Sequence, residues 1–384
     1  MKNATSPQRE STTSATSAGT LYVGLELSAR EWRLAYSPRL DVPARQVVVR
    51  AGDRPALREA LARAKARCGL APEARVRSCY EAGRDRFWPH RLLEADGVEN
   101  TVVDSSSIEV NRRARRAKTD RLDASKLLRL LLRYALGERD VWHVVHVPPP
   151  AGEDAQHGPR TVTMLTRERT RWRNRIHSLL ATVGVRLALD ARWNQRWAEA
   201  TQWNGTAVPV ALRARVDGAW QMLQHVEEAL RAARQAQRVA MRAGTSAAVT
   251  VQRLTTLRGI GDRFAWVLAT EVCSRDLQNR REVGALTGFT GVPYRSGTVA
   301  YDQGISRTGL AQVRGLAVET AWVWVQWQPH SALTQWFDTR FAHGGHAARQ
   351  IGIVALARRL VIALWRYSRD GVIPEGAVLK TRAA

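Results

Sequence analysis

The first third of the chain switches repeatedly between short runs rich in β-branched and aromatic residues and longer stretches with helical periodicity. The extended runs are LYVGLELS, WRLAYS, RQVVVR, VRSCYEAG and ENTVVD, with a helical stretch after the third run and another after the fourth. Strands that alternate with helices favour an α/β fold, because the helices can cover the faces of the sheet. A basic stretch then leads into an amphipathic helix that Gly137 ends, and WHVVHV is expected to form a last short strand.

The order of these elements narrows the fold class further. Two or three neighbouring strands, followed by alternating helices and strands, suit a ribonuclease H-like sheet, and they suit other mixed sheets as well. We therefore expect residues 21–159 to form one α/β domain. Residues 1–20 are rich in Ser and Thr and lack the apolar core of a secretion signal, so we expect a flexible tail there.

Residues 160–246 carry two long helical patterns after the loop PPPAGEDAQHGPR. In the second pattern apolar residues alternate steps of three and four, which is typical of a coiled coil or a long antiparallel helix pair. These seam positions are Val216, Ala219, Leu223, Val226, Leu230 and Ala233. We expect a helical connector, which is either an oligomerisation arm or a helical-bundle subdomain.

Residues 247–384 form a third, mostly helical region. Two helical patterns joined by Gly259-Ile260-Gly261 are similar to a helix-hairpin-helix, whose glycine turn presents N–H groups to a phosphate, although a plain turn explains them equally well. The glycine-rich stretch 288–309 is expected to be a loop, and such a long loop in a compact domain is usually functional. Two helices, over 310–327 and around 351–367, should follow it.

The chain is strongly basic, with a formal net charge of +24 and a pI near 11.3. Such a charge attracts polyanions at long range, so nucleic acid is the first partner to expect. Cys68, Cys79 and Cys273 are far apart and lack nearby histidines, which indicates neither disulfides nor zinc and suits a reducing cytoplasm. The most apolar stretch, Ile351–Trp365, is interrupted by arginines and too short to span a bilayer, so we expect no membrane partner.

Four carboxylates are candidate metal ligands. Glu26 lies in the first extended run, Glu81 ends the VRSCYE run, and Asp120 with Asp123 opens a helix. Carboxylates from separate elements can converge at one sheet edge and hold Mg²⁺, which prefers oxygen ligands and can polarise a phosphodiester. Each residue also has a structural explanation, since the aspartates suit a helix N-terminus and the glutamates suit solvated strand positions.

Basic residues crowd around the aspartate pair, namely Arg112, Arg113, Arg115, Arg116, Lys118 and Arg121. This run would draw a phosphate backbone toward the carboxylates. We therefore favour a metal-dependent nucleic-acid site over a merely solvated charged face.

Ser296, in the sequence Pro-Tyr-Arg-Ser-Gly-Thr, is a candidate nucleophile. A serine hydroxyl needs activation by a base, a metal or positive charge, and the local sequence supplies only Arg295. By itself a Ser-Gly pair is more often a turn. A competing pattern, His346 and Arg349 with Tyr367 downstream, has the form of the H-x-x-R box of tyrosine recombinases, but a loop entering an amphipathic helix explains it more simply.

Several motifs follow one another in an order that carries a family resemblance. They are L-Y-V-G-L-E-L-S at 21–28, Y-E-A-G at 80–83, K-T-D-R-L-D-A at 118–124, R-G-I-G at 258–261, P-Y-R-S-G at 293–297 and I-G-I-V-A-L-A-R-R-L at 351–360. In this order the chain resembles the insertion-sequence one-ten family of transposases, the bridge-RNA-guided recombinases, and especially its one-eleven-eleven branch. The match covers nearly the whole chain after Thr20.

The resemblance implies a RuvC-like, ribonuclease H-type domain, a helical coiled-coil connector and a C-terminal transposase domain. In such a protein Glu26, Glu81, Asp120 and Asp123 would hold Mg²⁺ or Mn²⁺, and Ser296 would attack a DNA phosphodiester. Glu26 stands where the family has aspartate, so its side chain is one methylene longer.

The resemblance also implies partners, namely donor and target DNA, a structured noncoding guide RNA and further copies of the chain in a dimer or tetramer, in the bacterial cytoplasm with the nucleoid. Two other activities suit the same residues. One is a RuvC-like nuclease or Holliday-junction resolvase that uses water as its nucleophile. The other is an inactive nucleic-acid-binding relative.

Overall fold

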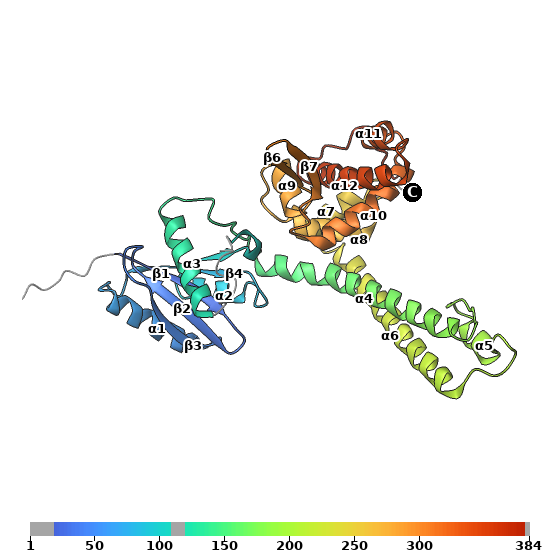
Figure 1. Ribbon diagram of the computed structural model, residues 1–384, viewed down its shortest axis with the longest axis horizontal. Helices are drawn as coiled ribbons and strands as arrows, with labels where there is room; N and C mark the ends of the chain where they lie inside the picture. The colour runs from blue at the N-terminus through green and yellow to red at the C-terminus, as the bar shows by residue number, and fades with distance from the viewer. Residues whose placement is uncertain (1–18, 109–119, 381–384) are drawn as a thin grey trace, which may run out of the picture. The chain divides into compact units, whose positions relative to one another are not determined.

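A computed structural model of the protein describes residues 19–108 and 120–380 (Figure 1). The chain divides into two compact units, Met1–Val147 and Pro148–Ala384, and we describe each by itself. Across the described residues, no helix is both long and apolar enough to cross a membrane. The basic residues from Arg112 to Lys118 lie outside the described residues.

The first unit contains a five-stranded sheet with strand order β3-β2-β1-β4-β5. Its elements are β1 (Thr20–Leu27), β2 (Glu31–Ser37), β3 (Arg45–Arg50), α1 (Arg54–Arg67), β4 (Arg75–Glu81), α2 (Trp88–Glu94), β5 (Glu99–Val103), the 3-10 helix η1 (Ser105–Ser107) and α3 (Asp120–Ala135). Strand β1 pairs antiparallel with β2 and parallel with β4. The predicted mixed α/β sheet is therefore confirmed.

The stretch WHVVHV does not form the predicted strand. Val144 makes one isolated bridge to Val103, and the N–H of Val145 donates to the carbonyl of Val102 at 2.8 Å. Three prolines follow at 148–150, and proline has no N–H with which to extend a ladder. Residues 142–147 therefore pair with β5 over only a short distance.

Helix α3 lies directly on the sheet at Gly24. A Cβ on Gly24 would lie 2.5 Å from the backbone nitrogen of Leu128 and 2.6 Å from the carbonyl oxygen of Ala124. Cys79, the register partner of Gly24, donates its thiol to the carbonyl of Leu127 at 3.5 Å. Burial raises the pKa of this thiol, which keeps the proton in place.

The direction of α3 follows from which residues it places over β1. Gly24 faces Ala124 and Leu128, whereas Tyr22, two residues earlier on the same strand face, packs against clusters that include Leu131. Helix α3 therefore runs antiparallel to β1. Its first turn lies toward the carboxyl ends of β1 and β4.

The second unit is helical except for one hairpin. Its elements are α4 (Pro150–Ala181), α5 (Trp193–Ala198), α6 (Val210–Ala240), α7 (Ser246–Thr255), α8 (Asp262–Leu268), the π-helix η3 (Ala269–Cys273), α9 (Arg280–Leu286), β6 (Gly291–Ser296), β7 (Val299–Ile305), α10 (Ala311–Trp327), α11 (Ala332–Phe341) and α12 (Gly345–Asp370). Two predicted loops are wrong. Helix α4 already begins at Pro150, where a missing N–H costs nothing, and the stretch 288–309 is mostly the β6–β7 hairpin.

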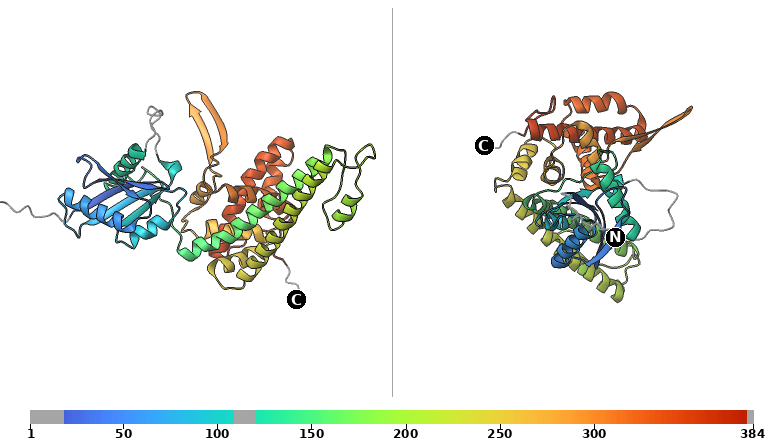
Figure 2. Two further views of the ribbon diagram at one scale, coloured as in Figure 1. Left: turned by 90° about the horizontal axis from the view of Figure 1, so that it is seen from below. Right: turned by 90° about the vertical axis from the view of Figure 1, so that its left-hand side faces the viewer.

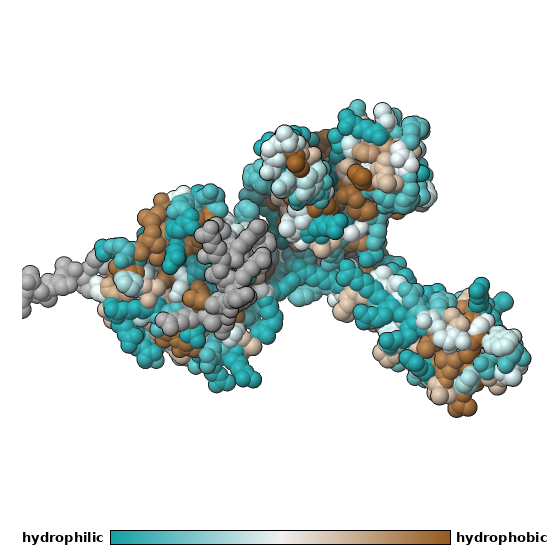
Figure 3. Space-filling model, viewed as in Figure 1, coloured by the Kyte–Doolittle hydropathy of each residue, from teal (hydrophilic) through white to brown (hydrophobic). Residues whose placement is uncertain are grey.

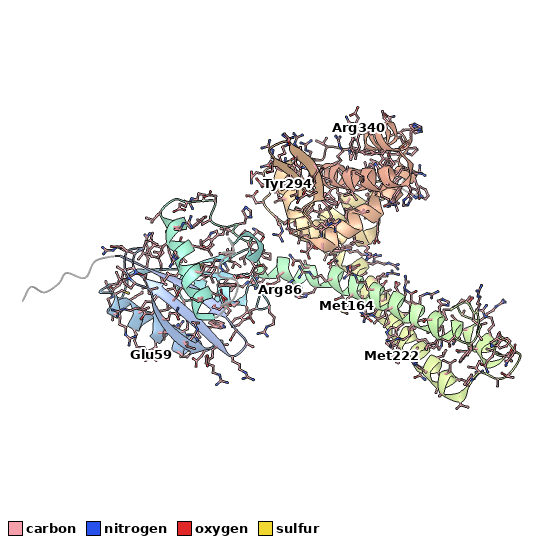
Figure 4. The ribbon with its side chains drawn as sticks, viewed as in Figure 1. Glu59, Arg86, Met164, Met222, Tyr294 and Arg340 are labelled. Atoms are coloured by element: carbon pink, nitrogen blue, oxygen red, sulfur yellow. The ribbon has the colours of Figure 1, made fainter. Side chains whose placement is uncertain are left out.

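Helices α4 and α6 form a long antiparallel pair (Figure 1). Ile176 and Leu180 of α4 pack with Leu223 of α6 in its core, while Met164 and Met222, labelled in Figure 4, lie on exposed faces. The first half of α4 contacts the C-terminal helices instead. Arg160 forms an ion pair of 2.7 Å with the buried Glu271, and Gln156 donates to the carbonyl of Thr270. These contacts join the helix pair to the rest of the unit.

The glycine turn near residue 260 connects α7 to α8. Gly259 has a φ of +83°, which favours glycine, and its neighbour Ile260 is buried in the core. Helix α8 is only seven residues long before it continues as the π-helix η3. The helix-hairpin-helix assignment stays a prediction.

We expect Gly24→Ala to lower the free energy of unfolding of the first unit by roughly 1–3 kcal/mol, because the new methyl group overlaps the α3 backbone. Hydrogen exchange of the β1 amides, measured at increasing urea concentrations, gives this free energy of unfolding. Gly83→Ala is the control, since its Cβ would meet nothing closer than 3.8 Å. Equal stability of the two variants would contradict the account of this contact.

Candidate functional site

Glu26 is the last residue but one of β1, and Glu81 is the last residue of the neighbouring strand β4. Their predecessors Leu25 and Tyr80 pair directly in the parallel β1–β4 register. Side chains alternate faces along a strand, so each glutamate lies on the same face as the residue two positions earlier, Gly24 or Cys79, which contacts α3. Both glutamates therefore belong to the α3 face at one edge of the sheet.

Asp123 precedes the Gly24 contact residue Ala124 and belongs to the first turn of α3. Three predicted ligands thus come from β1, β4 and α3 to the same edge, and carboxylate oxygens are the donors that Mg²⁺ and Mn²⁺ take. Among the side chains that the structure describes, no three His, Cys, Asp or Glu residues gather closely enough to hold a metal ion. The side chains of Asp120 and Arg121 lie outside that description, so the four-ligand site stays a prediction.

Ser296 lies at the tip of the β6–β7 hairpin. It pairs with Val299 around the two-residue turn Gly297-Thr298, and Gly297 has the positive φ of +57° that a type II′ turn requires at its first position. Figure 2 shows the hairpin standing away from the helices of its unit. Ser296 and Arg295 are exposed, and the Ser296 hydroxyl makes no hydrogen bond with any described residue. The serine is accessible, and the carboxylate of its own hairpin, Asp302, lies opposite Pro293 and accepts a hydrogen bond from the N–H of Gly304 rather than from Ser296.

The foot of the hairpin is held tightly, in contrast to its tip. Arg314 of α10 donates to the carbonyls of Thr287 at 3.1 Å, Thr308 at 3.0 Å and Arg307 at 2.9 Å. Burial and the neighbouring Arg307 lower the pKa of Arg314. Sequence reasoning missed this residue, whose only signal is its place one turn into the helix that follows the hairpin.

Two glycines allow the chain segments before and after the hairpin to pass close to each other at its foot. A Cβ on Gly288 would collide with the carbonyl oxygen of Thr308, and a Cβ on Gly309 would collide with that of Leu286. Closer to the tip, the rings of Tyr294 and Tyr301 lie against each other across the strands, tilted by 30° with centroids 4.8 Å apart (Figure 4 labels Tyr294). These glycines, predicted to belong to a loop, therefore allow the close backbone contacts that hold the hairpin at its foot.

The alternative tyrosine site is wrong. Arg349 and Tyr367 lie 18 residues apart on the single helix α12, which separates their Cα atoms by about 27 Å. Tyr367 is only 7% exposed, and its hydroxyl shares a 2.9 Å hydrogen bond with that of Thr256. These residues cannot surround one phosphate.

Comparison with known proteins gives a consistent result. Residues 251–335, which include the β6–β7 hairpin, match the Transposase IS116/IS110/IS902 family. The chain is 38% identical over 379 residues to y4rJ of Sinorhizobium fredii, whose name describes it as a transposase, with 94% of this chain and 95% of the relative covered. It is 30% identical over 127 residues to the transposase for insertion sequence element IS1328 of Yersinia enterocolitica, which covers 32% of this chain and 37% of the relative.

We expect Arg314→Gln to loosen the hairpin, because three carbonyls lose their shared donor. Amide hydrogen exchange in β6 and β7 should accelerate by about tenfold, which corresponds to roughly 1.4 kcal/mol. Arg295→Gln, on the exposed strand, should leave exchange unchanged. Protection of the hairpin that survives in the Arg314 variant would show that another contact holds it.

Proposed function

The chain belongs to the IS116/IS110/IS902 family of transposases, and from this premise we propose that Ser296 is the nucleophile with which it cuts DNA. The protein is an insertion-sequence transposase, an enzyme that acts on DNA and therefore binds it. The observation that carries the proposal is the position of Ser296, exposed at the tip of a braced hairpin within the segment that matches the family. A nucleophile at such a tip can approach a phosphate in a bulky duplex.

In the proposed reaction the Oγ of Ser296 attacks a DNA phosphorus. An O–P bond forms, the hydroxyl proton leaves, and the bond from phosphorus to a deoxyribose oxygen breaks, so that this oxygen departs and takes a proton. A hydroxyl of another DNA end then attacks the phosphoserine diester, which releases Ser296 and rejoins the strand. Arg295 would stabilise negative charge on the phosphate oxygens.

We propose that the first unit is a RuvC-like domain in which Glu26, Glu81, Asp120 and Asp123 hold Mg²⁺ or Mn²⁺. When bound, the ion would stabilise charge on the phosphate oxygens. The support is the chemistry and placement of the donors, since three of these carboxylates belong to one sheet edge under α3. The side chain of Glu26 is one methylene longer than that of an aspartate, so its carboxylate would reach the ion across one more bond.

A guide RNA and further copies of the chain complete the proposed assembly, which would work at the bacterial nucleoid. The net charge of +24 supports a second polyanion besides DNA. Figure 3 shows apolar surface at the end of the α4–α6 pair near α5. In the segment between α5 and α6, Trp203 is 80% exposed, and Val210, the first residue of α6, is 86% exposed. Such surface supports the assignment of this pair as an oligomerisation arm.

We expect Ser296→Ala to abolish both recombination and the covalent protein–DNA adduct, because the attacking oxygen is gone. Thr298→Ala, which removes a hydroxyl two residues away on the same turn, should retain both. The assay is excision of the parent insertion sequence in cells, with adducts detected on denaturing gels. Recombination by the Ser296 variant would favour a nuclease that uses water.

We expect Asp123→Asn to slow strand cleavage at least about 100-fold in Mg²⁺, because losing a charged ligand weakens stabilisation worth several kcal/mol. DNA binding should persist. Glu138→Gln is the matched control, since Glu138 pairs with Arg133 at the opposite end of α3. Normal cleavage by the Asp123 variant would remove this residue from the metal site.

A further inference from the structure

A groove of about 1290 Å³ lies at the foot of the β6–β7 hairpin, between α9, α10, α11 and α12 of the second unit. Besides Arg314, it is lined by six arginines, Arg280, Arg281, Arg307, Arg358, Arg359 and Arg366. Asp302 is the single carboxylate among its lining residues. Sequence reasoning missed this surface because the arginines come from segments far apart in the chain.

The positive charge in the groove is not neutralised by the protein. Within the described part of the chain, none of the six arginines forms an ion pair with a carboxylate, and Asp302 instead accepts a hydrogen bond from the N–H of Gly304 at 2.8 Å. Burial, together with repulsion from Arg340 and Arg358, lowers the pKa of Arg359. Like charges held this close favour a polyanion as the occupant.

The spacing of the arginines favours an extended anion. Arg358 and Arg366 are two turns apart on α12, which separates their Cα atoms by about 12 Å. Arg280 and Arg281 contribute from α9 on the same groove. Arginines anchored on two helices and along two turns of α12 suit successive phosphates of a nucleic acid better than one small anion, and the guanidinium group is suited to phosphate.

The position of the groove favours DNA. Gly291, the first residue of β6, lines it, and Ser296 is five residues farther along the same strand, at most about 17 Å away. That distance corresponds to about five base-pair steps of duplex at roughly 3.4 Å each. We propose that this groove binds the phosphate backbone of duplex DNA beside the bond that Ser296 attacks. The placement beside that bond rests on the proposed function, whereas binding itself does not.

Salt-dependent binding of the full chain to a labelled DNA duplex tests the proposal. In Arg358→Gln/Arg366→Gln the slope of log K against log salt should become shallower by about 1.8, from roughly 0.9 for each lost phosphate contact. Arg358→Lys/Arg366→Lys should keep the wild-type slope. Arg369→Gln is the matched control on the same helix, since Arg369 pairs with Asp370 and does not line the groove.

The outcomes separate this site from the serine mechanism. Ser296→Ala should bind the duplex with the wild-type slope whether or not it is the nucleophile. An unchanged DNA slope in the double glutamine variant would overturn the proposal, and a slope that changes only with a hairpin RNA would assign the groove to RNA. If the double variant has a lower melting temperature than the wild type, the single variant Arg366→Gln tests the proposal instead. Its slope of log K against log salt should become shallower by about 0.9.

Discussion

The contact between Gly24 and the backbone of α3 sets how closely this helix can lie on the sheet of the first unit. Because no side chain separates β1 from the carbonyl of Ala124 and the nitrogen of Leu128, the helix lies directly on the sheet. Its antiparallel course then brings its acidic first turn to the strand ends that carry Glu26 and Glu81. A bulkier residue at position 24 would move the helix, and with it Asp123, relative to the strands that carry the other carboxylates of the proposed metal site.

In the second unit, the β6–β7 hairpin is held firmly at its foot and exposed at its tip. Arg314 and two closely approached glycines hold the hairpin at its foot, while Ser296 lies beyond the helices that surround that foot. In the proposed reaction, this arrangement would let Ser296 approach a duplex without exposing the core of the unit. The Ser296 hydroxyl makes no hydrogen bond with any described residue, so in the proposed reaction its activation would come from bound partners, from Arg295 or from the proposed metal site.

The parts of the fold that follow from buried periodicity could be predicted from the sequence. The strands of the first unit and the helix seam at Val216 and Leu223 have apolar patterns because each buries one face. The β6–β7 hairpin could not be recognised in this way. Its residues are exposed on both faces, so no alternation marks them, and its glycines serve a close crossing rather than a loop. The start of α4 at Pro150 could not be predicted, because the run of prolines there is equally typical of a loop.

The candidate sites show the same division. The carboxylates could be named from the strands and the helix that carry them, and the family resemblance then assigned them to one site, but the edge that Glu26 and Glu81 share follows from strand register and the Gly24 contact. The groove arginines have no sequence signal, since α9 and α12 bring together residues from Arg280 to Arg366 only after folding. The position of Ser296 at an accessible tip could not be predicted from the sequence, because it depends on the β6–β7 hairpin, which the sequence did not reveal.

The most direct test of the central claim is tandem mass spectrometry of the covalent complex, trapped with a nicked DNA substrate that cannot be rejoined. The account predicts a nucleotide attached to the peptide that contains Ser296, through its Oγ. A nucleotide on any other residue, or cleavage with no covalent complex at all, would contradict it.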